Sequence, residues 1–278
     1  MTTISDIDGD AERERWTASA ALWDRWADPM AELADKLNQP LLDAAGVEPG
    51  SIVLDLASGI GEPALSAARR AGPDGFVVGT DLVPAMLTGA MRRAAIVRSP
   101  PAFAAADMTA LPFPDAAFDT VTCRFGIMFV PDAVGALAEV RRVLKPGGRA
   151  ALMVWGPHTD NALFAVIGSV VEDRLGPDAA HALSPLFRYA DAGSLAAALR
   201  QAGFAQATET ARTPIRKAPR TQPFWRPTLD MVFGPLVAGL APHDRAALEA
   251  DIVRRFDALA QGDTVPLPAH VRIAVGVA

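Results

Sequence analysis

The most informative segment of this chain covers residues 52–63 and has the sequence Ile52-Val53-Leu54-Asp55-Leu56-Ala57-Ser58-Gly59-Ile60-Gly61-Glu62-Pro63. An apolar run is followed by small residues, a pattern typical of a buried strand, a tight turn and the start of a helix. The small residues Ala57, Ser58, Gly59 and Gly61 let the backbone approach a ligand, because larger side chains would block it. We therefore expect a nucleotide-like molecule to bind at this turn.

Two acidic residues, Asp81 and Asp107, follow at the ends of the next two predicted strands. The carboxyl ends of parallel strands meet at one edge of a sheet, where open α/β sheets bind ligands. A carboxylate at Asp81 can accept hydrogen bonds from both hydroxyls of a ribose, and Asp107 can accept one from the exocyclic amine of adenine. The alternatives are a solvated carboxylate at each of these positions and a plain turn at Gly59 and Gly61.

The glycine spacing also matches, in outline, the fingerprint of a dinucleotide site. Gly59 and Gly61 are followed by Asp81, 20 residues after Gly61. Glu62 would place a negative charge against a pyrophosphate, and Pro63 removes a backbone donor that the pyrophosphate would use. A cationic ligand suffers neither penalty, so an NAD(P)-dependent oxidoreductase stays an alternative only.

Five segments in order resemble motifs of the class I S-adenosylmethionine-dependent methyltransferases, within the small-molecule branch similar to the ubiquinone/menaquinone C-methyltransferases. The segments are residues 53–61, 79–82, 106–113, 118–121 and 144–149. Their joint occurrence is far more specific than any one of them alone. The resemblance implies S-adenosylmethionine as cofactor and S-adenosylhomocysteine as product.

The resemblance also implies an α/β fold, with a doubly wound, mainly parallel seven-stranded sheet of the Rossmann-like methyltransferase type whose last strand is antiparallel. Alternating apolar strands and amphipathic helices with short turns predict a sheet of the same kind. Strands are expected at 51–56, 75–80, 102–106, 118–124, 149–155, 205–212 and 271–277. Helices are expected at 12–45, 62–71, 83–97, 132–144 and 191–202.

We expect three parts along the chain: an N-terminal helical cap (1–50), a cofactor-binding core (51–156), and the remainder of the sheet with two substrate-lid insertions (157–278). The insertions cover residues 157–190 and 213–268, which mix proline with aromatic and aliphatic residues. Such a mixture is typical of helical lid elements and not of disorder. Together with the N-terminal helix, the insertions would roof the site.

The predicted cofactor site has twelve residues: Asp55, Ala57, Ser58, Gly59, Gly61, Asp81, Leu82, Met86, Asp107, Met108, Arg124 and Phe125. Asp55 would offer an acceptor to an amino group or a water, and Leu82 and Met108 would cover the adenine ring. Ala57 stands where the family usually has glycine. A positive φ at this residue would strain the loop and reduce cofactor affinity, whereas a negative φ would tolerate alanine.

The predicted acceptor site comprises Trp26, Phe125, Trp155, His158, Phe224 and Trp225. His158, just after the fifth predicted strand, is the candidate general base, with a surface-loop histidine as the alternative. Arg124 either binds an acidic group of the substrate or pairs with a nearby carboxylate. Trp16 and Trp23 either line the pocket or pack the N-terminal helix onto the sheet.

The expected chemistry is methyl transfer to an oxygen, nitrogen or carbon atom of a small, partly hydrophobic metabolite. Because the leaving group is already activated, the protein chiefly aligns the reactants and excludes water. The chain has no Gly-x-Ser-x-Gly, no His-Glu-x-x-His and no Cys/His cluster, so we expect neither hydrolase chemistry nor a metal. A noncatalytic protein that binds S-adenosylmethionine or S-adenosylhomocysteine stays an alternative, since no clear base is present.

The composition of the chain limits the classes of partner and the cellular location that we expect. The formal net charge of −6 argues against nonspecific binding to nucleic acid and to anionic membranes. The single cysteine, Cys123, excludes an internal disulfide and is expected as an inert buried thiol. No apolar span reaches membrane length and the N-terminus is acidic, so a cytoplasmic location is expected. A homodimer through the lid or the N-terminal helices is compatible with the sequence.

Overall fold

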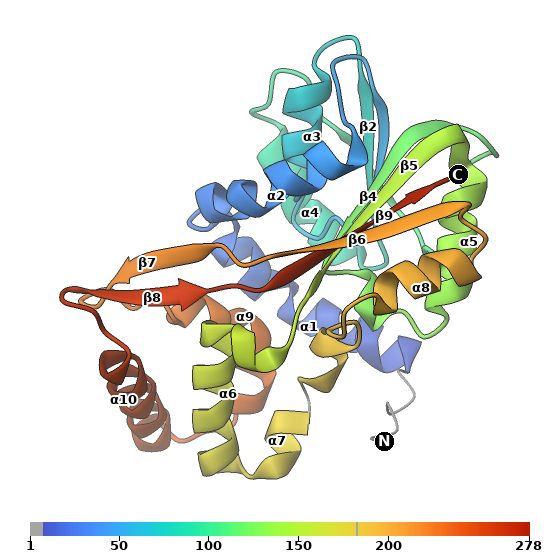
Figure 1. Ribbon diagram of the computed structural model, residues 1–278. Coiled ribbons are helices and arrows are strands. Elements are labelled where there is room, and N and C mark those ends of the chain that lie inside the picture. The colour runs from blue at the N-terminus through green and yellow to red at the C-terminus, as the bar shows by residue number, and fades with distance from the viewer. Residues whose placement is uncertain (1–7, 182) are drawn as a thin grey trace.

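The sheet is built of seven strands: β1 (Ile52–Leu56), β2 (Phe76–Asp81), β3 (Ala102–Ala105), β4 (Phe118–Arg124), β5 (Leu144–Trp155), β6 (Gln206–Arg212) and β9 (Val271–Val277). The computed structural model, which describes residues 8–181 and 183–278, gives their order as β3-β2-β1-β4-β5-β9-β6 (Figure 1). Strands β1 to β5 are parallel, and β9 is antiparallel to both β5 and β6. This confirms the predicted sheet. Residues 1–7 of the predicted cap and residue 182 lie outside the described residues.

Helices cover both faces of the sheet: α2 (Ala31–Ala45), α3 (Ala64–Ala71), α4 (Pro84–Ala94), α5 (Ala133–Val143) and α8 (Ser194–Gln201). α2 and α3 share a core with Val53 and Met153, whereas α5 and α8 share one with Leu54 and Leu152. Neighbouring residues of a strand point to opposite faces, so both faces are apolar. α4 packs on β2 and β3.

The N-terminal segment forms two helices where the sequence predicted one over 12–45. α1 (Gly9–Ala27) begins at Asp8, whose carboxylate accepts from the backbone N–H groups of Asp10 and Ala11. The helix ends just before Pro29, because proline lacks an N–H and its ring clashes with the preceding turn. α1 then packs on α4, while α2 lies on the sheet.

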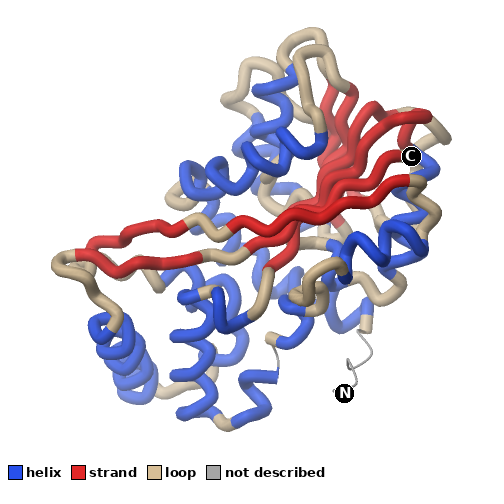
Figure 2. The backbone as a smooth tube through the Cα atoms, in the orientation of Figure 1, coloured by secondary structure: helices blue, strands red, loops and turns tan. Residues whose placement is uncertain are grey.

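A second, two-stranded sheet extends the first. β7 (Ile215–Pro219) continues β6, and β8 (Thr264–Pro268) leads into β9, so the two pairs form one long antiparallel ribbon that projects beyond the main sheet (Figures 1 and 2). Helical elements were expected over 213–268; α9 (Arg226–Val237) and α10 (Pro242–Ala258) do lie there, but the two ends of the insertion are strands. Proline does not exclude these strands, because each has a free edge where no N–H is required.

Helices from the two insertions share a core with this ribbon. They are α6 (Ala162–Leu175), α7 (Pro177–His181), α9 (Arg226–Val237) and α10 (Pro242–Ala258), and the first insertion also has 3₁₀ turns at η2 (His158–Asp160) and η3 (Ser184–Phe187). A further 3₁₀ turn, η1 (Ile127–Phe129), follows β4 in the main domain. Phe233 of α9, Ile252 of α10 and Val265 of β8 are fully buried in it. The two insertions, which lie apart in the sequence, therefore form one packed body.

Cys123 lies fully buried in β4, and burial raises the pKa of its thiol to about 12. The thiolate is therefore scarce at neutral pH, as expected for an inert core residue. Of the helices in the described part of the chain, none has the length and apolar content needed to cross a membrane.

Truncating Phe233 tests how tightly the insertions pack. Phe233→Ala leaves a cavity beneath α9 and should lower the free energy of unfolding by about 3–5 kcal/mol. Val253→Ala on the partly exposed face of α10 is the control and should change it by less than about 0.5 kcal/mol. Urea denaturation of the three proteins gives the comparison, and equal losses in both variants would show that the insertion core is loose.

Candidate functional site

One cavity, of about 1060 Å³, lies at the carboxyl ends of β1, β2 and β4. Its floor is the turn after β1, the strand end at Asp81 and the residues after β4. Its roof comes from α1, α2, α9 and β7 through side chains such as Trp16, Leu33, Met231 and Arg216. The two N-terminal helices and the second insertion thus stand over the strand ends, where open α/β sheets bind ligands.

Most residues of the predicted cofactor site line this cavity. They are Ala57, Ser58, Gly59, Asp81, Leu82, Met86, Asp107, Met108, Arg124 and Phe125. Gly61 and Asp55 lie behind the lining: a Cβ on Gly61 would press on Leu65 of α3, and Asp55 is fully buried. The structure therefore brings together residues that are 68 positions apart in the chain, from Ala57 to Phe125.

Asp55 holds the glycine turn in place. Its Oδ2 accepts from Ser58 Oγ at 2.7 Å and from the backbone N–H of Ala64 at 3.1 Å, and its Oδ1 accepts from Thr122 Oγ1 at 2.7 Å. Both carboxylate oxygens are therefore taken by the protein, and the expected direct contact with an amino group or a water is not supported. Burial raises the pKa of Asp55 to about 7, against the hydrogen bonds from Ser58 and Thr122, which lower it.

Asp81 connects the same turn to α4. Its oxygens accept from the backbone N–H groups of Gly59 at 2.8 Å and Val83 at 2.9 Å, and burial raises its pKa. Beside it, Gly59 has a φ of +51°, and no atom lies within 4 Å of the position that a Cβ would occupy. An open stretch of backbone next to a carboxylate is a suitable cradle for a ligand with a ribose diol.

Ala57 adopts a φ of +50°, so the strained case foreseen from the sequence holds. A left-handed conformation costs a residue with a Cβ about 1–2 kcal/mol. The methyl group fits because its neighbour is Gly126, where a Cβ would lie only 2.4 Å from the Ala57 Cβ. Alanine at 57 therefore depends on glycine at 126.

Arg124 is half-buried in the cavity wall at the end of β4. Its only hydrogen bond among the described residues is a long one, 3.4 Å from Nη1 to the carbonyl oxygen of Ala34, and its buried Nε has no partner. Burial lowers its pKa. Since no carboxylate of the described chain pairs with it, the guanidinium is free to bind an acidic group on a ligand.

Three aromatic rings form an apolar wall beside Arg124. Phe125, with a φ of +60°, stacks on Trp155 with 4.0 Å between ring centroids, and Phe164 meets Trp155 edge-on at 5.0 Å. All three line the cavity. The Phe125 ring therefore lies flat on Trp155 from a backbone conformation that is uncommon for a residue with a Cβ.

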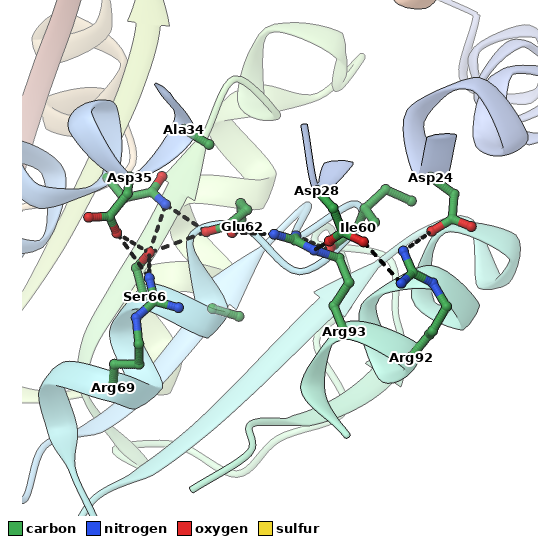
Figure 3. Close-up of polar contacts among 12 residues, drawn as sticks. Asp24, Asp28, Ala34, Asp35, Ile60, Glu62, Ser66, Arg69, Arg92 and Arg93 are labelled. Atoms are coloured by element: carbon green, nitrogen blue, oxygen red, sulfur yellow. Dashed lines mark hydrogen bonds and ion pairs between the residues drawn. The ribbon is translucent and has the colours of Figure 1, made fainter. Parts of the chain in front are cut away.

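Arg93 ties the roof to the glycine turn (Figure 3). Its Nη1 donates to the carbonyl oxygen of Ile60 at 2.7 Å, its Nη2 to Glu62 at 2.9 Å and its Nε to Asp28, between α1 and α2, at 3.0 Å. Glu62 also accepts from Asn38 Nδ2 of α2 at 2.6 Å. The charge of Glu62 is therefore largely neutralised, so it opposes a pyrophosphate less than the sequence alone suggested.

Three of the predicted acceptor residues do not reach the cavity. His158 lies in η2 against Phe187, with 5.1 Å between ring centroids, outside the lining. Phe224 packs on Phe256 at 4.9 Å, and Trp225 is buried in the insertion core. The sequence placed them in the right segments, but it carries no signal for the direction of a side chain in a loop.

Trp26 and Trp155 do line the cavity, and so do Trp16 and Trp23. Trp16 stands edge-on to Phe129 at 5.0 Å while also packing with the apolar residues under α1. Trp16 and Trp23 therefore line the cavity, and they pack α1 against the glycine turn and α4 and not against the sheet. Asn161 and Arg216 were missed; Asn161 left no signal in the sequence, and the signal of Arg216 was the alternation of β7, a strand that was not expected.

Known methyltransferases are similar to this chain in sequence. The profile of a family described as "Methyltransferase domain" matches residues 54–152. The ubiquinone/menaquinone biosynthesis C-methyltransferase UbiE of Cupriavidus metallidurans is 36% identical over 171 residues, which cover 58% of this chain and 70% of that protein. This chain belongs to the S-adenosylmethionine-dependent methyltransferases. The cofactor of the family is S-adenosylmethionine, and the cradle at Gly59 and Asp81 is compatible with it.

Other relatives are similar over shorter stretches of the chain. The demethylmenaquinone methyltransferase of Thermus thermophilus is 43% identical over 125 residues, 45% of this chain and 56% of that protein. The chain spans about half the length of the curated relatives it matches first. A crystal structure of a methyltransferase described as putative from Bacillus halodurans has the same fold, with a TM-score of 0.56, 20% identity, and 86% and 97% of the two chains covered.

Relieving the strain at position 57 should offset the usual cost of a glycine. We expect Ala57→Gly to change the free energy of unfolding by less than about 0.5 kcal/mol, because the release of about 1 kcal/mol of backbone strain balances the entropy that glycine gains in the unfolded chain. Ala106→Gly, at a lining alanine without a positive φ, is the control and should lose about 0.4–1 kcal/mol. Urea denaturation measures both variants, and equal losses would mean that strain at 57 is unimportant.

Asp55 should give the stability a pH dependence of definite sign. Its pKa is about 7 in the fold against 3.8 for an ordinary aspartate, so the folded state binds more protons between these pH values and the free energy of unfolding falls as pH rises through them. Asp55→Asn should lose less stability between pH 5 and pH 8 than the wild type does. Urea denaturation at both pH values tests this, and parallel losses in the two proteins would contradict it.

Proposed function

We propose that this chain transfers the methyl group of S-adenosylmethionine to a small, partly apolar acceptor. The observation that carries this proposal is the single cavity that joins the glycine turn and the strand-end carboxylates to a wall of aromatic rings. When bound, the cofactor supplies a methyl group that a sulfonium has already activated. The protein then has to align the acceptor with that group and exclude water.

The residues proposed to hold the cofactor each offer a matching group. Asp81 suits the ribose hydroxyls, and the oxygen of Asp107 that is not bonded to Thr109 suits the adenine amine. Leu82, Met86 and Met108 offer apolar cover for the ring, and the unpartnered Nε of Arg124 suits the carboxylate of the methionine moiety.

For the acceptor, we propose a ring carbon next to a hydroxyl group, as in a quinol or a naphthol; this carbon attacks the methyl group while the sulfur–methyl bond breaks, and it then loses its proton to water. Phe125, Trp155 and Phe164 offer flat apolar surfaces against which a ring can stack. None of the described residues that line the cavity is a histidine, and His158 lies elsewhere. An acceptor that is itself electron-rich needs less help from a base than a neutral alcohol does. The relatives whose names state C-methylation or menaquinone support the same class.

Binding of three ligands tests the cofactor. Calorimetric titration with S-adenosylmethionine, S-adenosylhomocysteine and NADH should show micromolar binding of the first two and none of the third. Asp81→Ala should weaken S-adenosylhomocysteine by about 10- to 100-fold, since a hydrogen bond to a charged group contributes about 1.5–3 kcal/mol. Asp178→Ala, at an exposed site outside the cavity, should change nothing.

Three other results would decide between the proposed function and its alternatives. Binding of NADH alone would overturn the proposal in favour of the oxidoreductase. Unchanged affinity in Asp81→Ala would remove this residue from the cofactor site. Transfer of a labelled methyl group to any hydroxylated naphthalene or quinol would end the noncatalytic alternative.

A further inference from the structure

Arg216 points into the cavity from the ribbon. Along β7 the exposed residues Ile215 and Lys217 alternate with the half-buried Arg216 and the fully buried Ala218. Side chains two apart on a strand share a face, so Arg216 lies on the same face as Ala218, which packs into the insertion core. Arg216 itself lines the cavity.

Within residues 8–181 and 183–278, the guanidinium of Arg216 has no counter-ion. Three acidic residues of the insertion are bound to other arginines: Asp230 to Arg245, Glu249 to Arg226 and Arg245, and Asp257 to Arg220. Across the described residues, Arg216 makes neither an ion pair nor a hydrogen bond. Its guanidinium carbon lies 5.9 Å from the centroid of the Phe224 ring.

This charge is partly desolvated. Burial lowers the pKa of Arg216 and no charged partner offsets the effect. The cavity lining near it includes Leu267, opposite Arg216 in the ribbon, and Met231 and Val232 of α9, while the one other cation of β7 in the lining, Lys217, is exposed to solvent. A part-buried cation without a partner destabilises the fold, and a bound anion would remove that penalty.

A guanidinium in such surroundings favours a carboxylate, which it can bind with two parallel hydrogen bonds. We propose that Arg216 binds a carboxylate of the methyl acceptor, so that the substrate is an apolar molecule carrying a carboxylate group. This inference rests on the proposed function. Arg124, at the strand end beside the glycine turn, serves the cofactor, whereas Arg216 comes from the insertion and serves the acceptor.

Matched pairs of small molecules test this assignment. The probes are 1-naphthoate, 1-hydroxy-2-naphthoate, 4-phenylbutyrate and decanoate, each with its neutral amide, titrated calorimetrically with and without saturating S-adenosylhomocysteine. We expect the wild type to bind at least one carboxylate at least 10-fold more tightly than its amide. Arg216→Ala should abolish this preference while binding S-adenosylhomocysteine normally, and Arg216→Lys should keep part of it.

The control is Arg212→Ala, which removes the same charge from exposed β6 outside the cavity and should keep the preference. No carboxylate preference in the wild type, or an equal preference in Arg216→Ala, would overturn the assignment and leave the proposed function standing. Loss of the preference in Arg212→Ala as well would also overturn it, by showing that net charge alone is responsible. Failure of the wild type to bind S-adenosylhomocysteine would instead reject the proposed function.

Discussion

The buried carboxylate of Asp55 fixes the conformation of the glycine turn, on which the proposed cofactor site depends. It receives hydrogen bonds from the glycine turn, from the first turn of α3 and from β4, and so joins three elements through one side chain. A buried carboxylate with three donors tolerates little displacement, because each lost bond would leave a polar atom unsatisfied in the interior. The positive φ values at Ala57 and Gly59 persist because this constraint holds the turn from below.

The roof is bound to the same turn and does not merely rest above it. Arg93 contacts the Ile60 carbonyl oxygen, Glu62 and Asp28 together, so the junction between α1 and α2 and the floor of the cavity share one guanidinium. The outer ion pairs, Arg92 with Asp24 and Asp28, are exposed and contribute little. The Arg93–Glu62 pair is buried, and removal of either partner would leave a charge unpaired beneath the turn.

Local patterns were sufficient to predict the sheet. Apolar runs followed by small or acidic residues identified β1, β2 and β3, and the five ordered motifs identified the family. The direction of side chains in the insertions was not predictable, because His158, Trp225 and Arg216 owe their positions to packing between segments far apart in the chain. The strands β7 and β8 were missed because their prolines indicate loops unless the free edges of the strands are known. Asp55 was recognised as important, but its partners were visible only in three dimensions.

The ribbon formed by β6, β7, β8 and β9 separates two tasks in one chain. The ends of the main strands carry the proposed cofactor site, while residues 220–263 leave and return through adjacent strand ends of β7 and β8. A segment that enters and exits at neighbouring points can change in length or sequence without altering the register of the sheet. Residues 220–263 can therefore change during evolution, and the choice of acceptor with them, while the residues proposed to bind the methyl donor stay the same. Arg216 lies in β7, just before this segment.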